Sequence, residues 1–271
     1  MTRLVFVSAS LLALAVGTAT AADYPIGPGI GPQYAVSPAY VITPGFSWNG
    51  FYVGGNVGGH FGSDKITPTA DASGGFGPAG AAAINAMSPT TLNPIGVIGG
   101  IQGGYNWQIG NVLYGLEVDV NAVGGTAQRT LSGFPVNVIS PGDFMTNSTG
   151  ATALATVRPR LGWVWDRNLF YITGGYAFGN VRATDTFSFF SGAFVGAFNV
   201  SARQSGWTAG AGYEYAFANA WSVKVEYLFV DLRGFINLIP GPLAGAPANI
   251  HVQHQYTDNI ARVGVNYHFG Y

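Results

Sequence analysis

The stretch SGWTAGAGYEYAFANAWSVKVEYLFVDLRG, residues 205–234, decides the fold class of this chain. On both sides of a short connection at 218–220, apolar and polar residues alternate one by one. Tyr213 and Val225 belong to the apolar sets, and Glu214 belongs to a polar set. Successive side chains of a strand point to opposite faces of a sheet. The stretch therefore predicts a hairpin of two antiparallel strands, each with one apolar and one polar face.

Segments of this kind recur from residue 50 to the end of the chain. We expect strands at 50–61, 95–108, 112–124, 151–165, 169–183, 205–217, 221–234 and 257–269. The segment 169–183 shows the weakest alternation. Three connections are hairpin-length, and the other four, 62–94, 125–150, 184–204 and 235–256, are long. Strict alternation of short and long connections is typical of outer-membrane barrels, which have short periplasmic turns and long external loops. The sequence therefore predicts an all-β fold, an eight-stranded antiparallel up-and-down transmembrane β-barrel.

The composition supports a membrane barrel over a soluble protein. Only 8% of the 271 residues are Asp, Glu, Lys or Arg, against about 25% in ordinary soluble domains. After the N-terminus, no apolar run reaches the roughly 18 residues of a helical membrane span. A soluble β-sandwich or barrel is the alternative. The net charge of −1 argues against a nucleic-acid partner, and a chain without Cys has no disulfide framework.

The N-terminus has the features of a signal peptide, which we place at residues 1–22. Arg3 precedes an apolar run over 4–16, and Ala19-Thr20-Ala21 forms a small-residue cleavage site. Cleavage is expected before Ala22 or one residue later.

The rest of the chain divides into two parts. Residues 23–47 are rich in Pro and Gly, which prevents a helix and removes ladder donors, so we expect an extended periplasmic linker. Residues 48–271 form the predicted barrel domain.

The two faces of the predicted strands indicate which side is the lumen. The polar face combines charged residues with glycines, namely Gly54, Gly58, Gly104, Gly115, Gly162, Gly210, Gly212 and Gly264. An eight-stranded barrel has an interior just wide enough for its own side chains. A Lys or Arg facing lipid near the midplane costs about 2–4 kcal/mol. We therefore expect charges and glycines inside and aromatic residues outside; a lipocalin-like barrel would have the reverse arrangement.

The inward charges balance. The predicted lumen network consists of Glu117, Asp119, Arg158, Arg160, Glu214, Lys224, Glu226 and Arg262. Counted from the turn between their strands, Glu117 matches Arg160 in depth and Asp119 matches Arg158. Unpaired charges in a narrow interior are very costly, whereas paired charges are tolerated. We predict a buried ionic network that plugs the barrel; it serves either packing alone or a gate that opens.

Aromatic residues gather where the predicted strands meet the short turns. They are Trp107, Trp163, Trp165, Trp221, Tyr267 and Phe269. Amphipathic rings prefer the headgroup level of a membrane. We interpret this group as the periplasmic aromatic girdle.

Several motifs resemble the small outer-membrane immunogenic proteins, a porin-family group of Gram-negative bacteria with the OmpA-type eight-stranded barrel. They are WNGFYVGGNVGG at 48–59, GGIQGGYNW at 99–107, GGYAFG at 174–179, KVEYLFVDL at 224–232 and RVGVNYHF at 262–269. The resemblance covers the chain from Trp48 onward. It implies an abundant, surface-exposed structural protein of the outer membrane, with porin activity often assigned by name.

The resemblance also implies two partners, the outer-membrane lipid and the barrel-insertion machinery. Members of the group usually end in an aromatic residue that this machinery reads. Here Gly270 and Tyr271 extend past Phe269. Tyr271 keeps the outward parity of the last strand, although the exact terminus departs from the pattern.

No catalytic, metal or cofactor motif stands out. His251 and His254 form an H-x-x-H pair in the last long connection, which we interpret as solvated loop residues. Haem binding, linked to some relatives of the group, remains the alternative for this pair. We predict a structural protein that presents surface-exposed antigen or interaction loops. The alternatives are a small diffusion porin for hydrophilic solutes and an outer-membrane enzyme, for which the sequence offers no triad.

Overall fold

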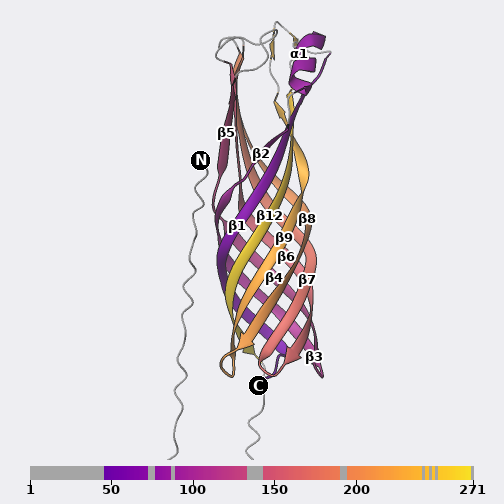
Figure 1. Cartoon of the computed structure of the whole chain (residues 1–271), viewed down its shortest axis with the longest axis vertical. Coiled ribbons are helices and arrows are strands. Elements are labelled where there is room, and N and C mark those ends of the chain that lie inside the picture. The colour runs from indigo at the N-terminus through magenta and orange to yellow at the C-terminus, as the bar shows by residue number, and fades with distance from the viewer. Residues whose placement is uncertain are drawn as a thin grey trace, which may run out of the picture. The chain divides into compact units, whose positions relative to one another are not determined.

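The computed structural model describes residues 46–72, 77–86, 89–132, 143–189, 194–239, 242–243, 246–247 and 250–269. The predicted signal peptide and all of the predicted linker except Phe46 and Ser47 lie outside these residues. The described part is almost entirely β-structure (Figure 1).

Eight long antiparallel strands form one closed ring in the described residues. They are β1 (Gly50–Ala70), β3 (Ile95–Ile109), β4 (Val112–Val123), β6 (Phe144–Trp165), β7 (Asn168–Phe189), β8 (Phe194–Ala216), β9 (Trp221–Ile239) and β12 (Ile250–Phe269). Each strand pairs with its neighbours in chain order, and β12 pairs with β1 to close the ring. The prediction of an all-β, antiparallel up-and-down barrel is confirmed.

Shorter elements attach to the ring at one end. β2 (Thr90–Leu92) pairs with β1, and β5 (Ala127–Ser132) pairs with β6. β10 (Pro242–Leu243) and β11 (Ala246–Pro247) form a small separate hairpin. The helix α1 (Gly77–Asn85) follows β1 (Figure 1). No helix among the described residues has the length and hydropathy needed to cross a membrane.

The short connections lie together at the opposite end, the lower end in Figure 1, which we call the short-turn end. They join β3 to β4, β6 to β7 and β8 to β9. Gly110 and Asp166 have φ values of 60° and 54° in two of these turns. Positive φ at such positions matches the twist of tight hairpins.

The long connections were predicted as loops, and much of each is strand instead. β1 continues to Ala70, β8 begins at Phe194 and β12 begins at Ile250, so the hairpins extend well past the expected strand ends. We call this part of the barrel the long-hairpin end. The prediction failed here because neither face of these extensions is continuously apolar, as Ser63, Asp64 and Lys65 show on β1.

The outer face of the ring divides into an apolar band and a polar rim. On β1, the outward residues from Phe51 to Phe61 are apolar or Gly, and the next outward residues are Ser63 and Lys65. The eleven residues from Phe51 to Phe61 match the roughly 9–11 that a tilted strand needs to cross a bilayer. We therefore expect the part of β1 beyond Phe61, and the parts of the other strands at the same height, to lie outside the hydrocarbon layer.

The inner face is crowded, as the glycine pattern predicts. A Cβ atom added at any of the eight glycines predicted to face inward would come within 3 Å of another heavy atom. At outward glycines such as Gly55 and Gly59, the nearest atom is 3.7 Å or more away. Glycine is therefore required inside by the close approach of neighbouring strands and side chains.

Candidate functional site: the charged lumen

All eight charged residues of the predicted lumen network lie on the inner face, and none is more than 4% exposed. They come from β4, β6, β8, β9 and β12 and project toward one another at mid-height of the ring. Four are acids and four are bases, so their formal charges cancel. The geometry of the cluster explains how so many charges are accommodated out of water.

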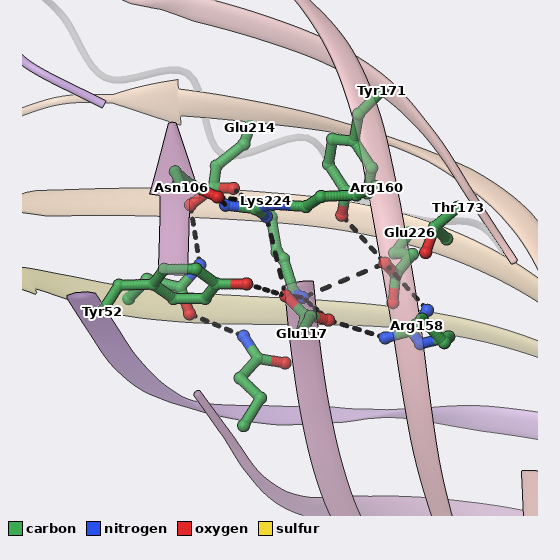
Figure 2. Close-up of polar contacts among 12 residues, drawn as sticks. Tyr52, Asn106, Glu117, Arg158, Arg160, Tyr171, Thr173, Glu214, Lys224 and Glu226 are labelled. Carbon is green, nitrogen blue, oxygen red and sulfur yellow. Dashed lines mark hydrogen bonds and ion pairs between the residues drawn. The ribbon is translucent and has the colours of Figure 1, made fainter. Parts of the chain in front are cut away.

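Glu117 lies at the centre of this cluster (Figure 2). Its carboxylate accepts hydrogen bonds from Lys224 Nζ at 2.8 and 2.9 Å and from Arg158 Nη2 at 2.6 Å. The Tyr52 hydroxyl donates a further hydrogen bond at 2.7 Å. Arg160 and Arg262 approach to 3.6 and 3.7 Å. Glu117 is thus the acid on which all four bases converge.

A second group of contacts closes around Arg158 and Arg262. Arg158 also donates to Asp119 at 2.8 Å, and Arg262 lies 3.1 Å from Asp119. Arg262 binds Glu226 through Nη2 at 2.6 Å and Nε at 2.7 Å. Such hydrogen-bonded pairs offset the large desolvation cost of buried ions only when each charge is well matched.

Arg160 and Glu214 form the part of the cluster nearest the short-turn end, with Nη1 and Oε2 3.2 Å apart. Arg160 also donates from Nε and Nη2 to the Asn106 amide oxygen at 2.9 and 2.7 Å. His268 Nε2 lies 2.9 Å from Ser222 and 3.5 Å from Glu214. The inward histidine of the last strand therefore contacts this cluster.

The predicted depth matching was wrong by two residues. β4 and β6 pair Glu117 with Arg158, and Gly115 with Arg160. Arg158 consequently reaches both Glu117 and Asp119, whereas Arg160 turns toward Glu214. The tilt of strands in a barrel staggers neighbouring strands, and residue counting from the turn ignores that stagger.

Two inward tyrosines of the cluster were not predicted from the sequence. Tyr52 binds Glu117, and the Tyr171 hydroxyl donates to Glu226 at 2.9 Å. The guanidinium of Arg160 lies 4.5 Å from the centre of the Tyr52 ring and 5.3 Å from that of Tyr171. A signal was present, because both tyrosines have the parity of the inward glycines of their own strands, not that of the outward aromatics.

An apolar floor lies between the ionic cluster and the short-turn end. Trp48 is fully buried there with Leu113, Val164 and Leu169, and Phe46 packs edge-on against it with ring centroids 4.8 Å apart. Phe46 was expected in the periplasmic linker, and no inward role was predicted for Trp48. Residues just before the first strand thus fold into the mouth of the barrel.

An apolar layer lies on the other side of the ionic cluster, toward the long-hairpin end. Its buried residues include Ile98, Val181, Leu228, Val230 and Leu232. Beyond it lies a small polar cluster, in which His254 Nδ1 is 2.8 Å from Asp64 and Nε2 is 3.7 Å from Asp185. The lumen is therefore filled by successive apolar, ionic, apolar and polar layers.

The interpretation of His251 and His254 as solvated loop residues is wrong for His254 and holds only in part for His251. Both lie in β12 and not in a loop; the His251 side chain is 36% exposed, whereas His254 is fully buried, with its ring stacked on Phe235 at 4.7 Å. In a strand, residues three apart point to opposite faces, so the two rings cannot hold one haem iron or metal ion together. Among the described residues, no group of three or more His, Asp or Glu has the arrangement of a metal site.

The six predicted girdle residues lie on the outer face near the short-turn end. Trp107, Trp163, Trp165, Trp221 and Phe269 are 44–71% exposed, and Tyr267 is half-buried between Trp221 and Phe269. Phe51 and Tyr105, which were not predicted as girdle residues, extend the same ring of aromatic side chains.

Comparisons with known proteins agree with this architecture. Residues 6–269 match the outer membrane protein β-barrel domain family. The 31 kDa outer-membrane immunogenic protein of Brucella melitensis biotype 1 is 32% identical over 267 residues, which cover 96% of this chain and 98% of that protein. The 22 kDa outer membrane protein of Rhizobium leguminosarum bv. viciae is 30% identical and covers 71% of this chain and 68% of its own length.

Among solved structures, the outer membrane protease OmpT of Escherichia coli aligns with a TM-score of 0.44 and 10% identity. The alignment covers 84% of this chain and 99% of that one. At this level of likeness, the protease activity of that protein says nothing about activity here.

Proposed function

Because this chain belongs to the outer membrane protein β-barrel family, we propose that it is a structural, surface-exposed protein whose lumen is plugged by charged side chains. The barrel resides in the outer membrane, as its relatives do. In this proposal, the ring anchors the long hairpins, which face the environment and serve as antigenic and interaction surfaces.

The observation that carries the proposal is the burial of the four bases. Arg158, Arg160, Lys224 and Arg262 are each at most 4% exposed, and each has a carboxylate partner within 3.2 Å. A water-filled channel would leave such side chains hydrated. The apolar floor around Trp48 adds a second barrier in series.

The proposal assigns the chain neither a diffusion channel nor an enzymatic activity. The buried acids and bases bind one another, so they are not free to bind or cleave a substrate.

The outward position of Phe269, at 54% exposure, suits recognition of the last strand by the insertion machinery.

Conductance in a planar bilayer tests the plugged lumen. We expect the purified protein to give no steady ohmic current. Steady openings whose size changes in Glu117→Ala or Arg160→Ala would favour the small diffusion porin and contradict the proposal.

Cysteine labelling on intact cells tests the placement of the hairpins. The natural chain has no Cys, so single variants give an unambiguous signal. Ala197→Cys, exposed on the extended part of β8, should react with a bulky maleimide that cannot cross the outer membrane. Ala218→Cys, in the turn between β8 and β9, is the matched control and should react only after the membrane is permeabilised. The reverse pattern would overturn the proposed orientation.

A further inference from the structure

A groove on the outer face of β4, β6, β7 and β8 lies at the upper edge of the apolar band. Its volume is about 340 Å³, and its lining includes Val120, Ala153, Ala155, Phe178 and Arg203. The groove is apolar along most of its length and ends against a basic side chain.

Strand register explains the form of this groove. Ala155 lies opposite Val120 on one side and Phe178 on the other, so a methyl group sits between two larger side chains. One outward position higher, Ala153 lies opposite Asn180, and Asn180 lies opposite Arg203. The two alanines leave a furrow that runs along the strand direction toward the polar rim.

Two arginines stand above the furrow. Arg203 and Arg182 are exposed on adjacent strands, and Arg182 is the next outward residue after Asn180. In the described part of the chain, no ion pair joins either arginine to a carboxylate, in contrast to the bases of the lumen. The outward acid Asp231 of β9 lies opposite Trp207 of β8, and Trp207 lies two outward positions below Arg203 on β8.

We propose that this groove binds a phosphorylated lipid of the surrounding leaflet, with an alkyl chain in the furrow and a phosphate on Arg182 and Arg203. Guanidinium groups bind phosphate through charge-assisted, frequently bidentate hydrogen bonds. The arginines lie just above the hydrocarbon layer, where lipid phosphates are found. Assignment of that leaflet to the outer surface of the cell rests on the proposed function.

The basic rim distinguishes this groove from a second hollow on the lipid face of the described strands. A larger groove of about 630 Å³ is lined by Val57, Ala211, Val225 and Ala261 among others. The arginine beside it, Arg262, points into the lumen and binds Glu226. That groove supplies a matched control of similar apolar character without an outward base.

Binding of purified full-length protein in a nonionic detergent tests the proposal. The probes are diphosphoryl lipid A and the same lipid after enzymatic removal of its phosphates. Native mass spectrometry should show selective retention of the phosphorylated form. Loss of each arginine removes a charge-assisted contact, so Arg182→Gln and Arg203→Gln should each weaken binding by about tenfold or more.

Two matched pairs of variants make the test specific. Ala155→Phe fills the furrow and should reduce binding, whereas Ala261→Phe in the larger groove should not. Lys65→Gln removes an exposed base of β1 and should leave binding unchanged. Equal retention of both lipids, or equal losses in the control variants, would overturn the proposal. The assay does not depend on which side of the membrane the hairpins face, so its outcome is independent of the cysteine labelling.

Discussion

Replacing Glu117 by Gln should destabilise the barrel more than any other single charge-neutralising change. Glu117 is 1% exposed and takes ion pairs at 2.8 Å from Lys224 and 2.6 Å from Arg158. The amide keeps the shape of the side chain but leaves these two bases without their shared counterion. Breaking a buried pair by removing one partner costs about 3–5 kcal/mol, so we expect a loss in that range.

A double-mutant cycle separates the ion pair from the shape of the site. Lys224→Met alone should also destabilise, because Glu117 then lacks the ammonium group that donates to both of its carboxylate oxygens. In the double variant the two losses should not add, and we expect a coupling of about 2 kcal/mol or more, within the range for contacting residues. Urea unfolding in detergent micelles, followed by Trp fluorescence, measures all four free energies.

Asp71→Asn is the control acid. Its carboxylate lies 3.3 Å from His251, but the side chains of Asp71 and His251 are 51% and 36% exposed, and exposed pairs contribute about 0–1 kcal/mol. If Glu117→Gln changed the unfolding free energy no more than Asp71→Asn, or if the cycle were additive, the assignment of Glu117 as the centre of a buried network would be refuted.

Three further predictions concern the closed sheet, its interior and the hairpins above it. On a gel, the unheated protein should migrate differently from the boiled protein, since a closed barrel resists SDS; equal mobility would contradict the fold. Gly212→Val should cost about 1–3 kcal/mol, because its side chain would meet the Tyr171 ring, whereas the outward Gly55→Val should be near neutral in the same urea titration. Burial lowers the pKa of His254, but Asp185 and Asp64 outweigh burial and raise the pKa to about 9. The pKa of His254 in the folded protein is thus higher than that of a histidine in the unfolded chain, about 6.5. The ion pairs of protonated His254 therefore stabilise the folded state fully below about pH 6.5, and this contribution is lost as the pH rises through 9. The rate at which a protease cleaves the long hairpins, divided by the same rate in His254→Gln, should therefore rise between pH 7 and 10. A ratio that stays constant over this range would contradict the role of His254.

Sequence patterns located the strands best where one face meets lipid. β4 was expected at 112–124 and spans Val112–Val123, and its outward Leu116 and Val118 alternate with inward acids. Above the apolar band this contrast disappears, so the upper part of β12 was assigned to a loop. The alternation that identifies a membrane strand arises because one face contacts lipid. The pattern therefore does not reveal the part of a strand that extends beyond the lipid into water.

The weakest strand prediction, 169–183, shows a second limit. The corresponding β7 is one of the longer strands, and it alternates poorly because Ala177 and Val181 point inward. The lumen is ionic at mid-height and apolar directly above and below, and the polar cluster around His254 lies beyond the upper apolar layer. The assumption that the inner face carries charge along its whole length therefore misjudged this strand.

The identity of the eight network charges followed from parity and charge balance, but their partners did not. Parity fixes the face of each side chain, whereas pairing depends on stagger and on the reach of long side chains across the lumen. Tyr52, Tyr171 and Trp48 were missed because aromatic residues were expected only on the lipid face. In a narrow barrel, a ring can also fill the interior where a facing glycine provides the space, as Gly104 does for Tyr52.

The network has a further consequence for the register of the sheet. Every long strand of the ring contributes at least one side chain to it. The contributors are Tyr52, Asn106, Glu117, Arg158, Arg160, Tyr171, Glu214, Lys224, Glu226 and Arg262. A slip of one residue would turn a strand's inward side chains outward, and a base turned toward lipid near the midplane costs about 2–4 kcal/mol. Buried ion pairs are weak evidence for stability, since apolar replacements of equal volume are often as stable. We therefore expect the network to contribute to correct folding mainly by excluding wrong strand registers. A variant with all eight charges replaced by well-packed apolar residues should insert with mixed registers, even where its folded form remains stable.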